Sequence, residues 1–148
     1  MLTMDILHPD IEEFITKKQD LTKVTGANIS IKVSDDFMNA VMHDEDFILR
    51  FPIDIKISEE DMTIMKDASY NKLVRSGNVY MKRISAVKLW QKLIHCAWNT
   101  AEPGIIFQDR MVDYAPDGVY PNYRTISTNP CSEIGMGAYD SCRLMHIN

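Results

Sequence analysis

The chain has 148 residues, enough for one domain, and its hydrophobic fraction of 45% and charged fraction of 25% are ordinary for a globular protein. A net charge of −5 and the lack of any basic run argue against nucleic acid as a partner, and every apolar run is far too short to span a membrane. The first residues do not resemble a signal peptide, so we expect a cytoplasmic protein whose three cysteines stay reduced.

The first third of the sequence predicts a helix, a strand and a second helix. The string His8-Pro9-Asp10-Ile11 begins the first helix, because proline suits the first helical position and acidic residues suit the positive end of the helix dipole. Residues 28–33 alternate polar and apolar side chains, which predicts a strand, and we interpret Asn28 as a hydrogen-bonding residue at its end. Ser34 then caps a helix over residues 35–42.

The middle of the chain predicts short elements and carries no recognisable chemistry. Ser58 begins a helix with a capping box, and Gly77-Asn78 marks a turn. We interpret this part as an insertion or as a hairpin on the surface of a barrel. Its expected elements are strands over residues 47–52, 53–57 and 79–82, a helix over 59–68, and a loop over 71–76.

A long amphipathic helix is predicted over residues 86–100. Its apolar face, which includes Trp90 and Trp98, is wide enough that we expect the helix to be well buried. His95 and Cys96 lie within it, and we interpret both as core or partly exposed helical residues and not as ligands.

Both ends of this helix carry local signals. Ser85 caps its start, and Glu102-Pro103-Gly104 ends it. Residues 105–107 then predict a buried strand, and the stretch from Pro116 to Asn122 is rich in turn residues.

The densest group of reactive side chains lies in the stretch Ser127-Thr128-Asn129-Pro130-Cys131-Ser132-Glu133. In an extended segment, residues two apart point to the same side, so Asn129, Cys131 and Glu133 would face one pocket. Pro130 would stiffen the approach to the cysteine. Glu133 offers a base, Asn129 offers an amide that can hold a hydroxyl, and Cys142, 11 positions beyond Cys131, offers a second thiol.

Two other interpretations of these cysteines fit less well. A zinc site usually takes its ligands from tight pairs such as C-x-x-C, and this sequence has no such pair, so we expect no metal. A hydrolytic cysteine needs a histidine base and a third orienting group, and the sequence marks neither. Two buried structural cysteines would leave the alternate spacing of Asn129, Cys131 and Glu133 unexplained.

The string Asn129-Pro130-Cys131-Ser132-Glu133 resembles the active-site loop of ribonucleotide reductases, with Tyr139-Asp140-Ser141-Cys142 behind it and Ile147-Asn148 closing the chain. The proline between asparagine and cysteine, and a second cysteine this close, are most similar to the adenosylcobalamin-dependent class, class II. The His8-Pro9-Asp10-Ile11 string, the strand and helix of residues 28–42, and residues 89–109 also resemble the family. The resemblance spans most of the chain and is weakest from about Pro52 to Asn78.

The resemblance implies an α/β fold in which residues 1–148 are a single fragment of the catalytic barrel domain. In the family, a ten-stranded α/β barrel surrounds an inward finger, and the loop from Asn129 to Glu133 would lie at its tip. The family enzymes are several times longer, so we expect the remaining segments of the reductase chain to complete the barrel and to supply the thiol partner of Cys142. We expect the isolated chain to be inactive and only marginally stable, because a strand series cut from a barrel leaves unpaired edges.

The resemblance also implies the chemistry. Adenosylcobalamin would generate the radical that takes the hydrogen atom from Cys131, and the thiyl radical would abstract the 3′ hydrogen of a ribonucleotide. Glu133 would take the 3′-hydroxyl proton, and the 2′ oxygen would leave as water. Cys142 would supply reducing equivalents with a second cysteine, and a thioredoxin-like dithiol would restore the pair. The substrate-binding residues would be Ser127, Thr128, Asn129 and Ser132.

Two functional alternatives stay open. The chain is either a catalytic piece of a ribonucleotide reductase or a catalytically incomplete remnant that acts as a binding or assembly module.

The sequence departs from the family pattern after Cys142. Many relatives have a smaller, Gly-Ser-type sequence where this chain has Arg143-Leu144-Met145-His146, which bears on the packing behind Cys142. The choice between a diphosphate and a triphosphate substrate is also open, as is the choice between class II and the oxygen-dependent class.

Overall fold

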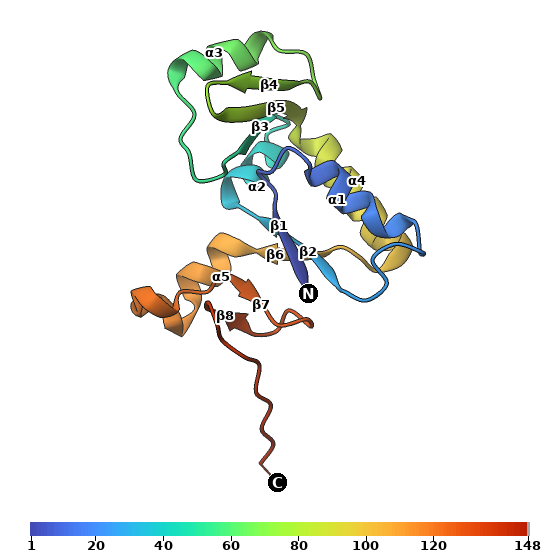
Figure 1. The fold of residues 1–148 in the computed structure, drawn as a ribbon, viewed down its shortest axis with the longest axis vertical. Coiled ribbons are helices and arrows are strands. Elements are labelled where there is room, and N and C mark those ends of the chain that lie inside the picture. Colours follow the sequence, from blue (N-terminus) through green and yellow to red (C-terminus); the bar gives the residue numbers. More distant parts are fainter. Residues whose placement is uncertain (148) are drawn as a thin grey trace.

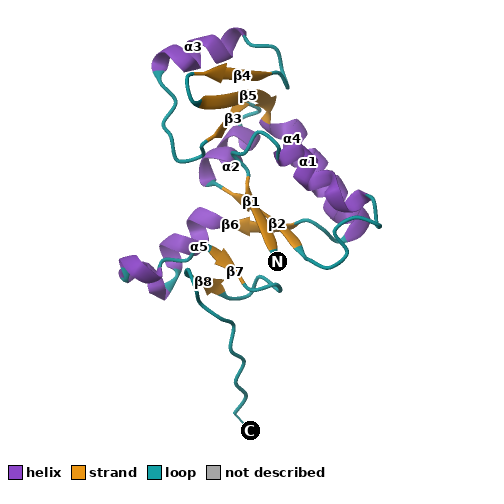
Figure 2. Cartoon of the chain, in the orientation of Figure 1, coloured by secondary structure: helices purple, strands orange, loops and turns teal. Residues whose placement is uncertain are grey.

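A three-stranded parallel sheet forms the centre of the computed structural model, which describes residues 1–147. Its strands are, in spatial order, β1 (Leu2–Asp5), β2 (Ile29–Val33) and β6 (Gly104–Phe107). Strand β2 is thus the central one (Figure 2). Its Ile31 lies opposite Met4 on one side and Ile105 on the other. Asn148, which belongs to the resemblance described above, lies outside the described residues.

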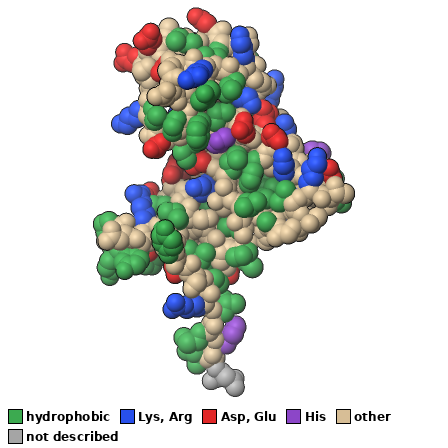
Figure 3. All heavy atoms as spheres, viewed as in Figure 1, with side chains coloured by type: hydrophobic (Ala, Val, Ile, Leu, Met, Phe, Trp, Pro, Cys, Tyr) green, Lys and Arg blue, Asp and Glu red, His purple; other side chains and the backbone are tan. Residues whose placement is uncertain are grey.

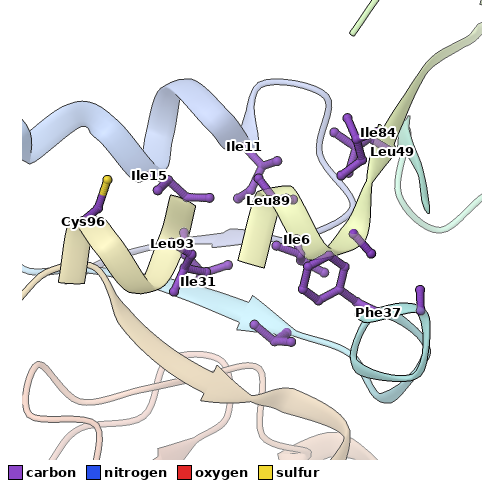
Figure 4. Close-up of a cluster of buried hydrophobic side chains, with 13 residues drawn as sticks. Ile6, Ile11, Ile15, Ile31, Phe37, Leu49, Ile84, Leu89, Leu93 and Cys96 are labelled. Carbon is purple, nitrogen blue, oxygen red and sulfur yellow. The ribbon is translucent and has the colours of Figure 1, made fainter. Parts of the chain in front are cut away.

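The hydrophobic core lies between this sheet and three helices (Figure 4). Ile31 from the sheet, Ile15 from the first helix, Phe37 from the second and Leu93 from the third are all fully buried. Burial of apolar surface on this scale is the main favourable contribution to folding. The helices are α1 (Ile11–Thr16), which continues into the 3-10 helix η1 (Lys17–Gln19), α2 (Asp35–Met42) and α4 (Ala86–Thr100).

A second sheet, antiparallel, adjoins the core, to which its residues Leu49 and Ile84 contribute (Figure 1). Leu49 and Met81 from its strands and Met65 from its helix are fully buried. Its central strand runs directly into helix α4, without a loop between them. The strands are, in spatial order, β3 (Asp46–Phe51), β5 (Val79–Ser85) and β4 (Leu73–Ser76), and the helix is α3 (Glu59–Asp67).

The last part of the chain forms short elements beside the parallel sheet. They are α5 (Gln108–Tyr114), the 3-10 helices η2 (Pro116–Val119) and η3 (Pro121–Tyr123), and the strands β7 (Ser127–Thr128) and β8 (Gly135–Met136). The described residues after 140 have no helix or strand and extend away from the rest (Figure 1). Exposed apolar side chains gather over α5, η2 and η3 (Figure 3): Tyr114, Val119, Tyr120 and Tyr123.

The predicted serine caps are confirmed. The Oγ of Ser34 accepts the N–H of Phe37 at 3.2 Å, and the Oγ of Ser58 accepts the N–H of Asp61 at 3.1 Å. Ser85 caps α4 in the same way. A side-chain oxygen at this position satisfies one of the backbone N–H groups that the first turn of a helix leaves free.

Other predictions were wrong. Residues 53–57 form no strand, and the expected loop over residues 71–76 contains strand β4, which pairs with β5. Helix α1 begins at Ile11, so Pro9 precedes it. Helix α4 buries only part of its apolar face, because Trp98 is 80% exposed.

The mixed α and β content agrees with the expected fold class, but the barrel is not seen. Within residues 1–147 the strands form separate sheets, none of which closes on itself, so a ten-stranded barrel is not confirmed. Both β1 and β6 are edge strands of the parallel sheet. No helix in the described part of the chain has the length and apolar character needed to cross a membrane.

Candidate active site

The stretch with the densest chemistry is the closed end of a small hairpin. Strand β7 pairs with β8 in antiparallel register, with Thr128 opposite Gly135. The N–H of Ser132 donates to the carbonyl of Asn129 at 3.0 Å, which closes a turn with proline in its second position. Proline suits that position because its ring fixes the backbone angle that the turn requires. Ser132 follows with a positive φ of 66°, so the chain reverses here.

This geometry corrects one prediction. The stretch from Asn129 to Glu133 is a turn and not an extended segment, so residues two apart do not share one side. Asn129 is buried in the hairpin at 2% exposure, whereas Cys131 and Glu133 are exposed. In this structure the amide therefore does not share a pocket with the thiol and the carboxylate.

Asn129 ties the hairpin together. Its backbone N–H donates to the carbonyl of Ile134 at 3.1 Å, and its side-chain Oδ1 accepts the N–H of Ile134, also at 3.1 Å. Its Nδ2 donates to the Sγ of Cys142 at 3.7 Å. The hydroxyl of Thr128 donates to the Asn129 carbonyl at 3.0 Å. The buried amide therefore joins both ends of the turn to the second cysteine of the motif.

The predicted substrate-binding hydroxyls differ in their exposure. Ser127 and Ser132 are half-buried, whereas Thr128 is buried and its hydroxyl is engaged within the hairpin. The Oγ of Ser127 lies 3.5 Å from the Oγ1 of Thr3, which belongs to β1. The hairpin is thus in contact with the edge of the parallel sheet.

A second contact joins the turn to the start of β2. The Nδ2 of Asn28 donates to the carbonyl of Pro130 at 3.2 Å. The interpretation of Asn28 as a hydrogen-bonding residue at a strand end is confirmed. Its partner was not foreseen, because the two residues are 102 positions apart in the sequence.

The remaining cysteine belongs to the core. Cys96 is buried in α4, and this burial raises the pKa of its thiol. Cys131 and Cys142 are free and exposed. Among residues 1–147, no group of three or more His, Cys, Asp or Glu side chains is placed to hold a metal ion.

A hollow of about 500 Å³ lies elsewhere, between α1, α4 and the antiparallel sheet. Its lining is charged and includes Glu12, Asp46 and Lys92. The Nζ of Lys92 lies 3.2 Å from a carboxylate oxygen of Glu12, so two of these charges neutralise each other. The hollow contains no residue of the hairpin, so the two cysteines of the motif do not line it.

Comparisons with known proteins cover the whole chain. Residues 1–148 match the family model described as ribonucleotide reductase, barrel domain. The chain is 37% identical over 143 residues to a vitamin B12-dependent ribonucleoside-diphosphate reductase of Thermoplasma acidophilum, an alignment that covers 95% of this chain and 15% of that protein.

Two further relatives carry similar names. The chain is 28% identical over 149 residues to the vitamin B12-dependent ribonucleoside-diphosphate reductase of Mycobacterium tuberculosis, covering 100% of the chain and 18% of that protein. It is 28% identical over 123 residues to a vitamin B12-dependent ribonucleotide reductase of Agrobacterium fabrum, covering 83% of the chain and 8% of that protein. The chain spans less than a fifth of the length of these relatives.

Proposed function

Because the chain belongs to the ribonucleotide reductase barrel family, we propose that it carries the radical-bearing cysteine of a ribonucleotide reductase, Cys131. The observation that carries this proposal is an exposed thiol at the tip of a hairpin whose turn is closed by the buried Asn129. A thiol in that place can reach a substrate while its backbone stays fixed. The reaction would convert a ribonucleoside diphosphate or triphosphate into the corresponding deoxyribonucleotide.

The polar side chains of the hairpin would have different roles in the reaction. The Cys131 sulfur, as a thiyl radical, would take the 3′ hydrogen atom of the ribose, and Glu133, exposed at the same tip, would accept the 3′-hydroxyl proton. Asn129 uses one N–H of its amide on Cys142 and would give the other to a substrate hydroxyl, which requires its buried side chain to turn toward the tip when substrate binds. The half-buried hydroxyls of Ser127 and Ser132 would add to the binding of the substrate.

The names of the relatives specify vitamin B12, and the exposure of the hairpin tip is compatible with such a group bound beside it. Pro130 and Cys131 are both exposed, so a cofactor bound outside the hairpin would face the thiol directly. We propose adenosylcobalamin, which when bound supplies the radical that removes the thiol hydrogen. The chain itself would position the sulfur and keep the turn rigid.

Reduction of the substrate also needs two electrons. Loss of the 2′ oxygen as water is balanced by oxidation of two thiols to a disulfide, and Cys142 would be one of them. Cys96 is buried in the core of α4, so we propose that the second thiol comes from another segment of the reductase. A thioredoxin-like dithiol would then reduce the disulfide by exchange.

The structure offers attachment points for such segments. The edge strands β1 and β6 present backbone groups to which further strands of a barrel could pair. The exposed apolar side chains over α5, η2 and η3 could serve as a binding surface. They therefore also fit the alternative function, a catalytically incomplete module for binding or assembly. Residues 1–148 would in both cases be one part of the barrel domain, and activity in the completed enzyme separates the two.

The test is reconstitution. The chain is mixed with the other segments of a class II reductase, adenosylcobalamin, a dithiol, and either a ribonucleoside diphosphate or a triphosphate, and deoxyribonucleotide is measured. We expect turnover that Cys131→Ser abolishes without loss of nucleotide binding, because a serine O–H bond is too strong for a hydrogen-atom carrier. Glu133→Gln should lower kcat with little change in stability, because it removes a base and no packing.

A matched control is Glu60→Gln on α3, which replaces an exposed glutamate far from the hairpin in the sequence and should leave turnover unchanged. Substantial reduction by the Cys131→Ser protein would end the radical assignment. A mixture that assembles but forms no deoxyribonucleotide with the unmodified chain would favour the assembly module.

A further inference from the structure

The backbone around Asn28 is held from two sides. The carbonyl of Asn28 accepts the N–H of Leu2 at 2.8 Å, which ties it to β1. The next N–H, that of Ile29, donates to a carboxylate oxygen of Glu102 at 3.0 Å. Glu102 in turn forms an ion pair with Lys18 from η1. Asn28 therefore starts from a fixed position at the edge of the core.

The side chain of Asn28 extends from this base to the hairpin tip. Its Nδ2 donates to the carbonyl oxygen of Pro130, which belongs to the peptide group joining Pro130 to Cys131. A peptide group is planar, so an anchor on its oxygen also restrains the nitrogen and Cα of Cys131. The ring of Pro130 fixes the φ angle of Pro130, so the backbone just before this peptide group is restricted as well.

The turn is thus held at two separate points. Asn129 fastens its two ends to each other from inside the hairpin, through Ile134. Asn28 fastens the peptide just before Cys131 to the parallel sheet. The first contact keeps the hairpin closed, and the second sets the direction of its tip relative to the sheet.

We infer that Asn28 is a positioning residue for Cys131, which holds the Pro130–Cys131 peptide and so sets the direction in which the thiol leaves the hairpin. Its consequence for catalysis rests on the proposed function. Reacting atoms must lie about 3–3.5 Å apart, and a displacement of about 1 Å costs about 100-fold in rate. A short turn with an exposed tip needs an outside anchor to meet that tolerance.

Because Asn28 is exposed, its hydrogen bond adds little to global stability. Its loss should therefore loosen the tip of the hairpin and leave the core intact. This separation between local order and stability makes the role measurable.

The first measurement needs no substitution. In the 148-residue chain, NMR follows the exchange of the side-chain amide hydrogens of Asn28 with solvent, and the amide of Asn78, exposed in the turn between β4 and β5, is the internal control. We expect the Asn28 amide to exchange roughly tenfold more slowly. Equal exchange of the two amides would overturn the inference.

The second measurement uses a nitroxide spin label on Cys131 in a Cys142→Ser chain, in which the remaining Cys96 is buried and does not react. Asn28→Asp keeps the shape of the side chain but removes the N–H donor, and Asn28→Ala removes both. Both should increase the motional rate of the label roughly twofold with no change in the melting temperature, whereas Asn78→Ala should leave the spectrum unchanged.

An unchanged label spectrum in both Asn28 variants would refute the positioning role. The spectrum does not depend on reductase activity, so a failure here is distinct from a failure of the proposed function. In the reconstituted enzyme, Asn28→Asp should lower kcat about tenfold or more with KM unchanged. A rise in KM of similar size would instead mean that Asn28 serves substrate binding, which contradicts the inference.

Discussion

Replacement of Asn129 by alanine should open the hairpin from the inside. The substitution removes the Oδ1 that accepts the N–H of Ile134 at 3.1 Å and the Nδ2 that donates to Cys142 at 3.7 Å. In a chain where the hairpin stays closed, the N–H of Ile134 then has no side-chain acceptor. The contact with sulfur is long and weak, so the cost should come mainly from this unpaired N–H.

The size of the effect follows from the burial of the site. An unpaired buried donor costs about 1–3 kcal/mol, and Ile134 is only half-buried, so water recovers part of that cost. A loss of about 1–2 kcal/mol remains, and with 1.4 kcal/mol for each factor of ten it corresponds to a fivefold to thirtyfold increase, roughly, in local opening. The assay is amide hydrogen exchange of Ile134 in the 148-residue chain.

Thr128→Val is the matched control within the same hairpin. It also removes a buried hydrogen bond, that of the Thr128 hydroxyl to the Asn129 carbonyl, but this carbonyl still accepts the N–H of Ser132. No backbone group is left unpaired, so the exchange of Ile134 should change less than about twofold. Equal acceleration in both variants, or none in Asn129→Ala, would refute the assignment of Asn129 as the residue that closes the turn.

Two further predictions concern the core and the antiparallel sheet. Leu93→Ala should lower the free energy of unfolding by about 2–5 kcal/mol, whereas Ile94→Ala, next to it but 46% exposed, should cost under about 1 kcal/mol; urea unfolding compares them. The hydroxyl of Tyr70 and then the guanidinium of Arg83 hold the pKa of Asp46 below its ordinary value. Its carboxylate therefore stabilises the fold above about pH 3.9, and this contribution is lost as the pH falls through the lowered pKa, so Asp46→Asn should reduce the acid sensitivity of stability below about pH 5. An unaltered pH dependence would contradict that prediction.

Elements that depend on local chemistry were predictable from the sequence. The serine caps of α2, α3 and α4 need only a hydroxyl three residues before a backbone N–H, and all three are present. The alternation of polar and apolar side chains in residues 28–33 is also a local signal, and it predicted β2. Strand β4 was missed because its four residues are too few to show a clear alternation, and the strand is stabilised by pairing with β5, a contact that no local pattern reports.

The candidate site was predictable in composition but not in geometry. The sequence placed Asn129, Cys131 and Glu133 at alternate positions, and only the pairing of β7 with β8 turns that stretch into a reversal. Trp98 shows the same limit, because periodicity defines the apolar face of α4 but not how much of it finds a partner. Asn28 was recognised as polar and terminal, whereas its contact with Pro130 depends on how distant segments pack.

The direct passage of β5 into α4 at Ser85 has a consequence for protein engineering. An α-helix turns once in 3.6 residues, so one residue inserted between Ser85 and Ala86 would rotate α4 by about 100° and pull Leu93 out of the core. The exposed Gly77, at the other end of β5, has a positive φ of 55° and open space around it. Tags or fluorescent reporters inserted there would extend into solvent and leave both the core and the cysteine-bearing hairpin undisturbed.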